Sequence, residues 1–326
     1  MNFGDYLSSV GRHDYFQNSP RLGGDGMRNP GPDAREMPPL TMWGRLRRDI
    51  LTWPRRVTAD KRVLPNMILL GAQRAGTTSI HSHLGKHPGV YLSKTKEIHY
   101  FDNYQEQGLD WYRSHFPTRS WAEGRSRELG YEMVIGEGTP YYLFHPEVPS
   151  RIHEAIPSAR LVVLLRNPVD RALSHFRHER RNGSEKEVDF QKAWDMEESR
   201  LAGTEERLSS GTSVYEESHN RFSYTTRGDY APQLERWFSL FDRTQIHIIR
   251  SEDLFNSPEE VLAGLFEFLG LPMVDLGDFP VLNSTMAKTP DEEELRLRER
   301  LAEHFAPKVE KLEELLGCSM GWSGDW

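Results

Sequence analysis

Short apolar runs alternate with stretches of helical periodicity from about residue 61 onward. The clearest run is Arg160–Leu165, where five consecutive apolar residues begin at Leu161, as in a parallel strand covered on both faces. Further buried strands are predicted at Met67–Leu70, Val134–Ile135 and Gln245–Ile249. Strands that alternate with helices indicate an α/β fold, with a central, mostly parallel β-sheet flanked by helices on both faces.

Polar caps mark where several helices should begin. Asn167 as N-cap, Pro168 at the first helical position and Asp170 in the first turn predict one such start. The segment Ser257–Glu260 has the pattern of a capping box and predicts a helix through Leu269. The segment Thr289–Glu292 repeats this pattern before a C-terminal helical region. Pro307 is expected to break that region into two helices.

Residues 1–60 are predicted to form an N-terminal arm, and residues 61–326 the main domain. The first forty residues are rich in Gly, Pro, Asn, Asp and Arg and have no apolar period, which predicts disorder. Trp43, Leu46 and Ile50 then recur at helical spacing among basic residues, which predicts a short amphipathic basic helix. Two alternatives stay open for residues 41–56, packing on the main domain or peripheral contact with a membrane surface.

The segment from Asn66 to Ser79 joins an apolar run to a glycine-bracketed loop and then to a helix predicted over Thr77–Leu84. This strand–loop–helix order is typical of a phosphate site and makes the domain P-loop-like. Gly71 and Gly76 have the spacing of G-x-x-x-x-G-K-[ST]. Thr77 occupies the position of the lysine, however, and the cationic side chain is that of Arg74, inside the loop. We expect backbone N–H groups, hydroxyls and one guanidinium to surround an anion, from Arg74, Ala75, Gly76, Thr77, Thr78 and Ser79.

Two further groups of residues suit the same chemistry. In the segment Lys96–Asp102, alternation would place Glu97 and His99 on one side of an extended chain, where Glu97 could act as a general base. A solvated charged loop is the alternative. Arg166 follows the Arg160–Leu165 strand, and Ser174 lies eight residues later. Because ligands bind at the carboxyl ends of strands in open α/β sheets, this pair suits a second phosphate, with a structural ion pair as the alternative.

In this order and spacing, the loop, the Lys96–Asp102 segment and the Arg166–Ser174 segment resemble the sulfotransferases that use 3′-phosphoadenosine 5′-phosphosulfate (PAPS). The chain is most similar to the branch that contains heparan sulfate sulfotransferases and their bacterial relatives. The resemblance runs from about residue 64 to the end. It extends to three other segments, Arg227–Trp237, Leu265–Pro272 and Ala287–Thr289.

The resemblance implies in-line transfer of a sulfuryl group from PAPS to a hydroxyl, rather than an amine, of a carbohydrate, lipid or small-molecule acceptor. Adenosine 3′,5′-bisphosphate is the product, and no metal is required. The implied catalytic residues are Glu97, Arg74 and His99. Arg166 and Ser174 would hold the 3′-phosphate. Two further residues, Lys288 and Thr289, would contribute to nucleotide binding, with the lysine closing over the nucleotide.

Much of the family has lysine where this chain has Arg74. An arginine neutralises charge but does not donate a proton near pH 7, so an electrostatic role is expected. Two other functions remain as alternatives, a P-loop nucleotide kinase-like phosphotransferase and a non-catalytic nucleotide-binding protein. Thr77 in the lysine position argues against the kinase, and Glu97 argues against the non-catalytic protein.

Composition adds a few limits. The net charge of −8 argues against a nucleic-acid binder, and Cys318 is the only cysteine, so no intrachain disulfide can form. No apolar run approaches the roughly 20 residues of a transmembrane helix, and no signal-peptide pattern is present, so a cytoplasmic protein is expected. The resemblance implies a bacterial source. His83 and His87 lack an H-E-x-x-H pattern, and no metal site is expected.

Two expectations concern the region after the predicted Pro168 helix start. His175 and His178 are expected on a solvated helix face. Residues 182–220 carry ten acidic and four basic residues, which favours a neutral or weakly charged acceptor if this segment lines the cleft. The sequence carries no prediction of oligomeric state or of the identity of the acceptor.

Overall fold

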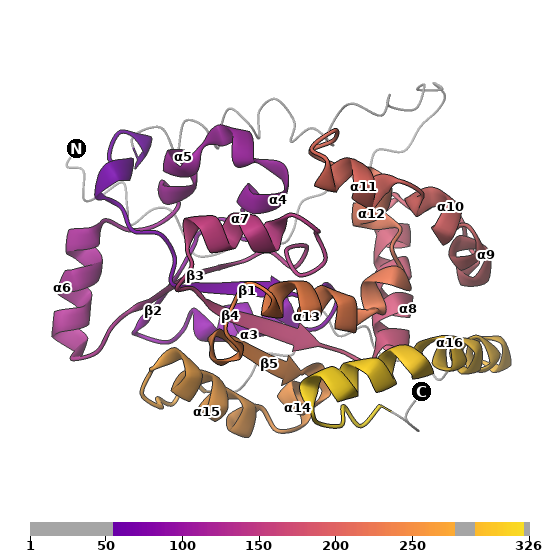
Figure 1. Cartoon of the computed structure of the whole chain (residues 1–326). Helices are drawn as coiled ribbons and strands as arrows, with labels where there is room; N and C mark the ends of the chain where they lie inside the picture. Colours follow the sequence, from indigo (N-terminus) through magenta and orange to yellow (C-terminus); the bar gives the residue numbers. More distant parts are fainter. Residues whose placement is uncertain (1–54, 278–290, 323–326) are drawn as a thin grey trace, which may run out of the picture. The chain divides into compact units, whose positions relative to one another are not determined.

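The computed structural model describes residues 55–277 and 291–322 (Figure 1). Their core is a five-stranded sheet with the strand order β2-β3-β1-β4-β5, in which every neighbouring pair is parallel. The strands are β1 (Met67–Gly71), β2 (Val90–Leu92), β3 (Val134–Gly138), β4 (Arg160–Leu165) and β5 (Ile246–Arg250). The four predicted strands are confirmed, whereas β2 is too short to stand out in the sequence.

The helices cover both faces of the sheet. α3 (Thr77–Leu84) connects β1 to β2, and α7 (Val148–Ala155) connects β3 to β4. These two connections run in opposite directions across the sheet, so right-handed crossovers place the helices on opposite faces (Figure 1). α15 (Pro258–Leu269) lies on the α3 face, where Phe266 packs edge-on against His87 with 5.1 Å between ring centroids. The predicted fold class is confirmed.

The other helices surround this sheet or extend beyond its carboxyl edge (Figure 1). They are α4 (Tyr100–Asn103), α5 (Leu109–Arg113), α6 (Arg119–Leu129), α8 (Pro168–Asn182), α9 (Phe190–Asp195), α10 (Glu197–Leu201), α11 (Thr204–Ser209), α12 (Glu217–Arg221), α13 (Tyr230–Phe238), α14 (Ser251–Asn256) and α16 (Glu292–Leu316). Short 3-10 turns lie at η1 (Ala59–Lys61), η2 (Gln105–Gln107), η3 (Thr226–Gly228) and η4 (Arg243–Gln245).

The predicted helix starts are borne out to different degrees. Asn167 caps α8 as expected, and its Oδ1 accepts hydrogen bonds from the backbone N–H groups of Val169 (2.9 Å) and Asp170 (3.4 Å). α15 begins at Pro258, but the Ser257 side chain makes no capping hydrogen bond, so the predicted box does not form there. α16 is capped by Asp291, and Thr289 lies outside the described residues.

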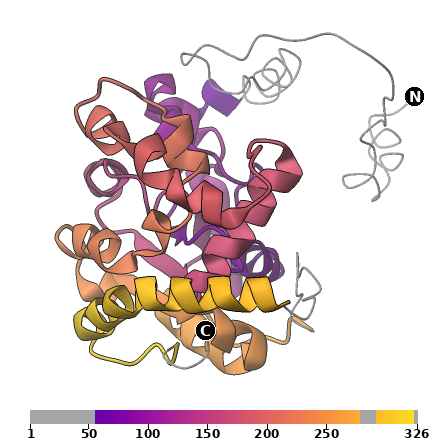
Figure 2. The ribbon, with the colours of Figure 1, turned by 90° about the vertical axis from the view of Figure 1, so that its right-hand side faces the viewer.

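Pro307 does not break the C-terminal region, so that prediction was wrong. α16 runs through it as one helix. Buried side chains on both sides of the proline, Phe305 before it and Val309 and Leu312 after it, hold the helix on the domain. Their packing outweighs the hydrogen bond that the proline cannot donate. Figure 2 shows α16 running across the domain below α8, and Arg298 Nη2 ties it to Asp170 Oδ1 at 2.7 Å.

The described part of the chain begins beside the predicted boundary between arm and domain. Arg55 Nε donates to Ser114 O at 2.6 Å, and Arg62 Nη1 donates to Phe116 O at 2.7 Å. The predicted basic helix at 41–56 falls outside the described residues except for its last two positions. Within residues 55–277 and 291–322, no helix combines the length and the apolar character needed to cross a bilayer.

Candidate functional site

The loops that follow β1 and β4 meet at the carboxyl edge of the sheet. Arg166 Nη1 donates to Arg74 O at 3.1 Å, and Arg74 Nε donates to Ser174 Oγ at 3.0 Å. These contacts bring together two sequence segments about a hundred residues apart. Because α3 and α7 leave for opposite faces, this edge is also where open α/β sheets bind ligands.

The conformation of the first loop exposes its backbone donors. Arg74 and Gly76 both have left-handed backbone angles, with φ of 71° and 92°. Among the described residues, no acceptor takes the N–H groups of Gly76, Thr77 or Thr78 at the start of α3. Successive N–H groups that converge at a helix N-terminus form a concave anion site.

Side chains from distant elements anchor this loop. Ser251 Oγ of α14 donates to Ala75 O, and Arg227 Nη1 donates to Gln73 Oε1. Another nitrogen of Arg227, Nη2, donates to the backbone carbonyls of His219 and Asn220 in α12, at 3.0 and 2.8 Å. Its guanidinium also lies over the rings of Tyr141 and Phe144, 5.1 and 4.9 Å from their centroids.

Arg227 is therefore a buried cation beside the loop, with 1% of its surface exposed. No described carboxylate forms a side-chain hydrogen bond with it, and burial lowers the pKa of its guanidinium to about 10. A buried charge without a counter-ion is costly and is commonly found where it serves a site. We missed Arg227 as a site residue in the sequence, although the Arg227–Trp237 segment belongs to the family resemblance.

The charge around Arg74 also indicates an anion site. Burial lowers the pKa of Arg74, and the nearby guanidinium groups of Arg181 and Arg166 lower it further by repulsion. Within the described residues, no carboxylate lies within 4.0 Å of Arg74, while Arg166 has only Asp170 at 3.9 Å. A bound anion would relieve this repulsion, because it would place negative charge among the three guanidinium groups.

A second cluster holds a carboxylate at the same edge. Glu97 N donates to Gly138 O at 3.2 Å, which fixes this segment to the end of β3. Glu97 Oε2 lies 3.8 Å from His99 Nε2, and His99 Nδ1 lies 2.6 Å from Asp102 Oδ2. The expected extended chain was wrong, because Glu97 and His99 have φ of 58° and 56°. The two side chains nevertheless lie close to each other.

Lys96 links this cluster to the phosphate loop. Its Nζ donates to Thr78 Oγ1 at 2.6 Å and lies 3.4 Å from Glu97 Oε1. Sequence reasoning noted Lys96 beside Glu97 but did not include it in the site, and it did not include Asp102 either. The signal for both was their place in the same short segment.

The protonation states of the cluster follow from its contacts. Burial alone would raise the pKa of Glu97, but His99 and Lys96 outweigh burial and lower that pKa. Burial would lower the pKa of His99, but Asp102 and Glu97 outweigh it and hold that pKa well above 6.5. Near pH 7 the cluster therefore holds an ionised Glu97 beside a positively charged imidazolium.

An aromatic side chain lies beside the loop as well. A Cβ placed on Gly76 would lie 3.0 Å from Phe255 Cζ, so a side chain at that position would meet the ring. Phe255, on α14, is 37% exposed, which is high for a phenylalanine. A ring at a phosphate loop can stack on a base, and this residue was missed because nothing in the sequence links α14 to the loop.

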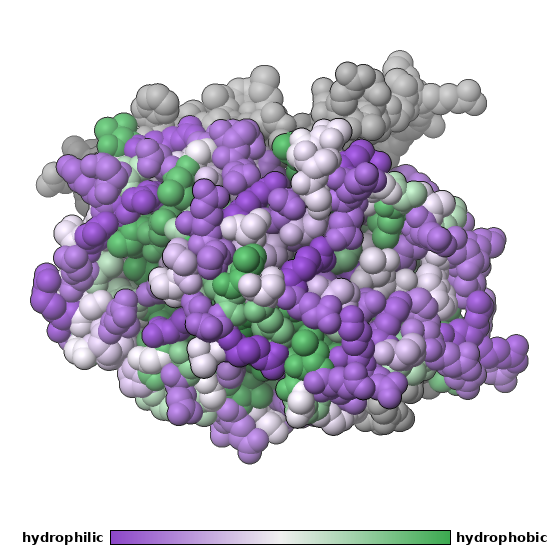
Figure 3. All heavy atoms as spheres, in the orientation of Figure 1, coloured by the Kyte–Doolittle hydropathy of each residue, from purple (hydrophilic) through white to green (hydrophobic). Residues whose placement is uncertain are grey.

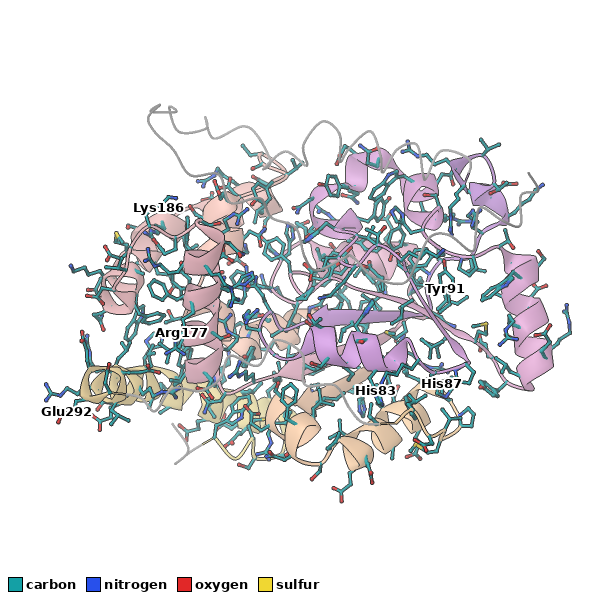
Figure 4. The ribbon with its side chains drawn as sticks, turned by 180° about the vertical axis from the view of Figure 1, so that it is seen from behind. His83, His87, Tyr91, Arg177, Lys186 and Glu292 are labelled. Carbon is teal, nitrogen blue, oxygen red and sulfur yellow. The ribbon has the colours of Figure 1, made fainter. Side chains whose placement is uncertain are left out.

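Four other residues were considered from the sequence, two for nucleotide binding and two for metal binding. Lys288 and Thr289 lie outside the described residues. His87 Nε2 lies 3.0 Å from Pro272 O, and Figure 4 shows His83 and His87 at the end of α3 far from the loop. The described residues contain no group of three or more His, Cys, Asp or Glu side chains arranged to hold a metal.

The two histidines of α8 differ from the expected solvated face. His175 is fully buried, with 0% exposure, so the prediction was wrong for it. It packs edge-on against Tyr224, with 5.0 Å between ring centroids, because that face of α8 turns inward. His178 is half-buried beside Arg181, and burial together with Arg74 lowers the pKa of His178.

The acidic segment 182–220 forms α9 to α11 and most of α12, beyond the end of α8, and hydrophilic residues cover most of that region in Figure 3. Much of its charge is internally paired. Glu185 pairs with Arg200 at 2.6 Å and Glu216 with Arg207 at 2.8 Å. Glu197 accepts hydrogen bonds from backbone N–H groups near residue 225. Two further carboxylates pair with arginines outside the segment, Glu205 with Arg236 at 2.5 Å and Glu217 with Arg221 at 3.2 Å, so the segment repels anions less than its own net charge indicates.

A family model described as a sulfotransferase domain matches residues 64–293. The membrane-associated sulfotransferase kil1 of Dictyostelium discoideum is 27% identical over 323 residues, covering 79% of this chain and 66% of that protein. Heparan sulfate glucosamine 3-O-sulfotransferase 5 of Mus musculus is 27% identical over 212 residues, covering 64% of this chain and 54% of the relative. The chain thus spans less than two thirds of the length of these relatives.

A solved structure gives a similar result. The crystal structure of a sulfotransferase from Alicyclobacillus acidocaldarius is 29% identical to this chain, with a TM-score of 0.55. The match covers 79% of this chain and 97% of that one.

Proposed function

This chain belongs to the sulfotransferase domain family, and from that membership we propose that it transfers a sulfuryl group from PAPS to a hydroxyl of an acceptor molecule. The observation that carries the proposal is the contact of Arg74 with both Arg166 and Ser174, beside a loop in which three successive N–H groups, from Gly76 to Thr78, have no acceptor among the described residues. That arrangement provides two neighbouring anion positions, as a nucleotide with phosphate groups on both its 3′ and 5′ oxygens requires.

The residues of the site fit this donor. In our proposal, the N–H groups and hydroxyls of the loop hold the 5′ end, together with Arg74. Arg166 and Ser174 hold the 3′-phosphate, and Phe255 stacks on the adenine. The additional nucleotide contacts expected from Lys288 and Thr289 remain predictions. Bound PAPS supplies an activated sulfuryl group and a phosphate leaving group.

Glu97 acts as the general base for the acceptor hydroxyl. Its lowered pKa keeps it ionised but makes it a weak base. It therefore takes the proton late, when the new bond to sulfur has made the hydroxyl acidic. The imidazolium of His99, held by Asp102, fixes the direction of the Glu97 carboxylate. His99 also stabilises the negative charge that crosses the site during transfer.

Lys96 can donate a proton, which Arg74 cannot. The guanidinium of an arginine stays protonated, whereas the ammonium of a lysine can pass a proton to a leaving oxygen. Lys96 Nζ contacts a hydroxyl of the phosphate loop and lies beside the base. We therefore assign charge stabilisation to Arg74 and proton donation to Lys96, which removes the difficulty raised by arginine in the loop.

The domain proposed for this activity comprises residues 61–326. The acceptor is a hydroxyl-bearing glycan, lipid or small molecule, in keeping with relatives whose names refer to heparan sulfate. Relatives come from an amoeba, animals and a bacterium, so the bacterial, cytoplasmic setting stays a prediction. Peripheral membrane contact by residues 41–56 also stays a prediction.

The test is a turnover assay with PAPS and a panel of hydroxyl and amine acceptors, which follows release of adenosine 3′,5′-bisphosphate and the mass of the product. We expect an acceptor-dependent mass gain of one sulfuryl group, and we expect Glu97→Gln to reduce it at least about a hundredfold. Phosphoryl transfer from ATP to the same panel, without sulfation from PAPS, would contradict the proposal.

A further inference from the structure

A pocket of about 290 Å³ lies beside the catalytic cluster, between α4, η2, α7 and the loop that precedes α12. Asp102 is part of its wall and also holds His99, with 2.6 Å between Oδ2 and Nδ1. His99 in turn contacts Glu97. The pocket therefore shares a wall with the residues that hold the proposed base. The lining residues are Asp102, Asn103, Gln105, Glu106, Arg151 and Val214.

One lining side chain has an unused hydrogen-bonding group. Asn103 is only 9% exposed, and its buried Oδ1 accepts no hydrogen bond from any described residue. Leaving a buried polar atom unpaired costs roughly 1–3 kcal/mol, and most such atoms in folded proteins have partners. The backbone N–H of Asn103 already donates to Asp102 Oδ1 at 2.8 Å. Oδ1 has almost no accessible surface in this conformation, so a ligand in the pocket becomes its partner only when the carboxamide rotates toward the pocket.

The chemistry of the wall points to hydroxyl groups. Asn103 and Gln105 each offer a donor and an acceptor in one plane, which matches hydroxyls that both donate and accept. Arg151 Nη1 donates to Phe101 O at 2.7 Å, which fixes its guanidinium at the wall. The exposed side chain of Val214 adds an apolar surface.

The charges of the pocket disfavour a strongly anionic ligand. Asp102 is paired with the imidazolium of His99, which leaves one carboxylate, Glu106, and one guanidinium, Arg151, at the wall. The wall therefore has no excess of positive charge to attract a ligand with several sulfate or carboxylate groups. The volume lies near the lower end of the roughly 300–1,000 Å³ typical of small-molecule pockets, which suits a single ring.

We propose that this pocket binds a neutral, hydroxyl-rich ring of the acceptor, a sugar or a cyclic polyol, and holds it beside Glu97. The inference rests on the proposed function and adds to it the acceptor class and the residues that select it. Asn103 and Gln105 are specificity residues in this scheme, and neither belongs to the nucleotide site.

The experiment measures binding of simple methyl glycosides by saturation-transfer NMR, with adenosine 3′,5′-bisphosphate present. The panel contains the glycosides of glucose, galactose and mannose and the corresponding uronic acids. Two pocket variants are compared with the wild type, Asn103→Leu and Gln105→Ala. Gln107→Ala is the matched control, because Gln107 is exposed like Gln105 but does not line the pocket. Thermal stabilisation by the bisphosphate shows that each variant is folded.

We expect at least one neutral glycoside to bind the wild type and the control. Each pocket variant should weaken it about fivefold or more, as loss of one hydrogen bond predicts. Asn103→Leu should melt no lower than the wild type, because it removes an unpaired polar group. Absence of neutral glycoside binding, equal binding by the pocket variants, or preference for the uronic acids would each overturn the inference. Loss of bisphosphate binding by the wild type would instead contradict the proposed function, and glycoside binding would then be measured without nucleotide.

Discussion

Replacing Arg74 separates the electrostatic role of this residue from its effect on folding. Its side chain contacts Ser174 at 3.0 Å, and its backbone has a left-handed φ of 71°. The first property concerns transfer and the second concerns stability, so three substitutions give different results. Alanine removes the charge and keeps the strained backbone. Lysine keeps the charge, and glycine removes both the charge and the strain.

The expected magnitudes follow from these contacts. Removing a donor aimed at developing charge costs about 10²- to 10³-fold in kcat, so Arg74→Ala and Arg74→Gly should lose that much. Arg74→Lys loses the contact with Ser174 but keeps the charge. A hydrogen bond worth about 0.5–1.5 kcal/mol corresponds to a loss of roughly two- to tenfold. Left-handed backbone costs a residue with a side chain about 1–2 kcal/mol, so the glycine variant should be more stable than the alanine variant by about 1 kcal/mol.

The assays are PAPS turnover at saturating acceptor and chemical unfolding without nucleotide. Neither the glycine nor the alanine variant should recover activity, although the glycine variant should unfold at a higher denaturant concentration. Equal losses of turnover in the lysine and alanine variants would refute the electrostatic role. A glycine variant less stable than the alanine variant would refute the claim that backbone strain is stored at this position.

Three other changes test the surroundings of the reaction. Asp102→Asn should lower the pKa of His99 and move the alkaline limb of the kcat/KM profile about 1–3 pH units lower. Because the pKa of His99 is raised in the folded protein, the His99–Asp102 pair stabilises the fold fully below about pH 6.5, and this stabilisation is lost as pH rises through the raised pKa. The loss of unfolding free energy caused by Asp102→Asn should therefore become smaller at alkaline pH. For Lys96, the glutamine and arginine variants should both lose turnover if the residue donates a proton, whereas rescue by arginine would indicate charge alone. Gln73→Ala and Arg227→Lys should each raise the KM for PAPS. Gln73→Ala should add little to Arg227→Lys, because the lysine variant has already lost the contact with Gln73; a full additional effect would show an independent role of Gln73.

The sequence predicted the parts of the site that depend on local patterns. The loop between β1 and α3, the cap at Asn167, and the placement of Arg166 and Ser174 beside Arg74 at one sheet edge all follow from spacing and strand order. Such features depend on a few neighbouring residues and on where parallel strands end. The roles of the site residues in the reaction remain proposals.

Long-range packing decided the features that the sequence did not show. The contact of Arg227 with Gln73 joins residues 154 positions apart, and Phe255 reaches the loop through the placement of α14. His175 looked like a surface residue, because polarity alone does not reveal which face of α8 is covered. Pro307 was expected to end a helix, yet packing on both sides of it prevailed over local propensity.

The most direct test of the central claim is the thermal stability of the protein with adenosine 3′,5′-bisphosphate, compared with ATP, GTP and AMP. A ligand at about 100 times its Kd adds about 2.7 kcal/mol to the unfolding free energy, which gives a clear shift in Tm. We predict a shift with the 3′,5′-bisphosphate alone, and its loss in Arg166→Ala. An equal or larger shift with ATP or GTP would contradict the account.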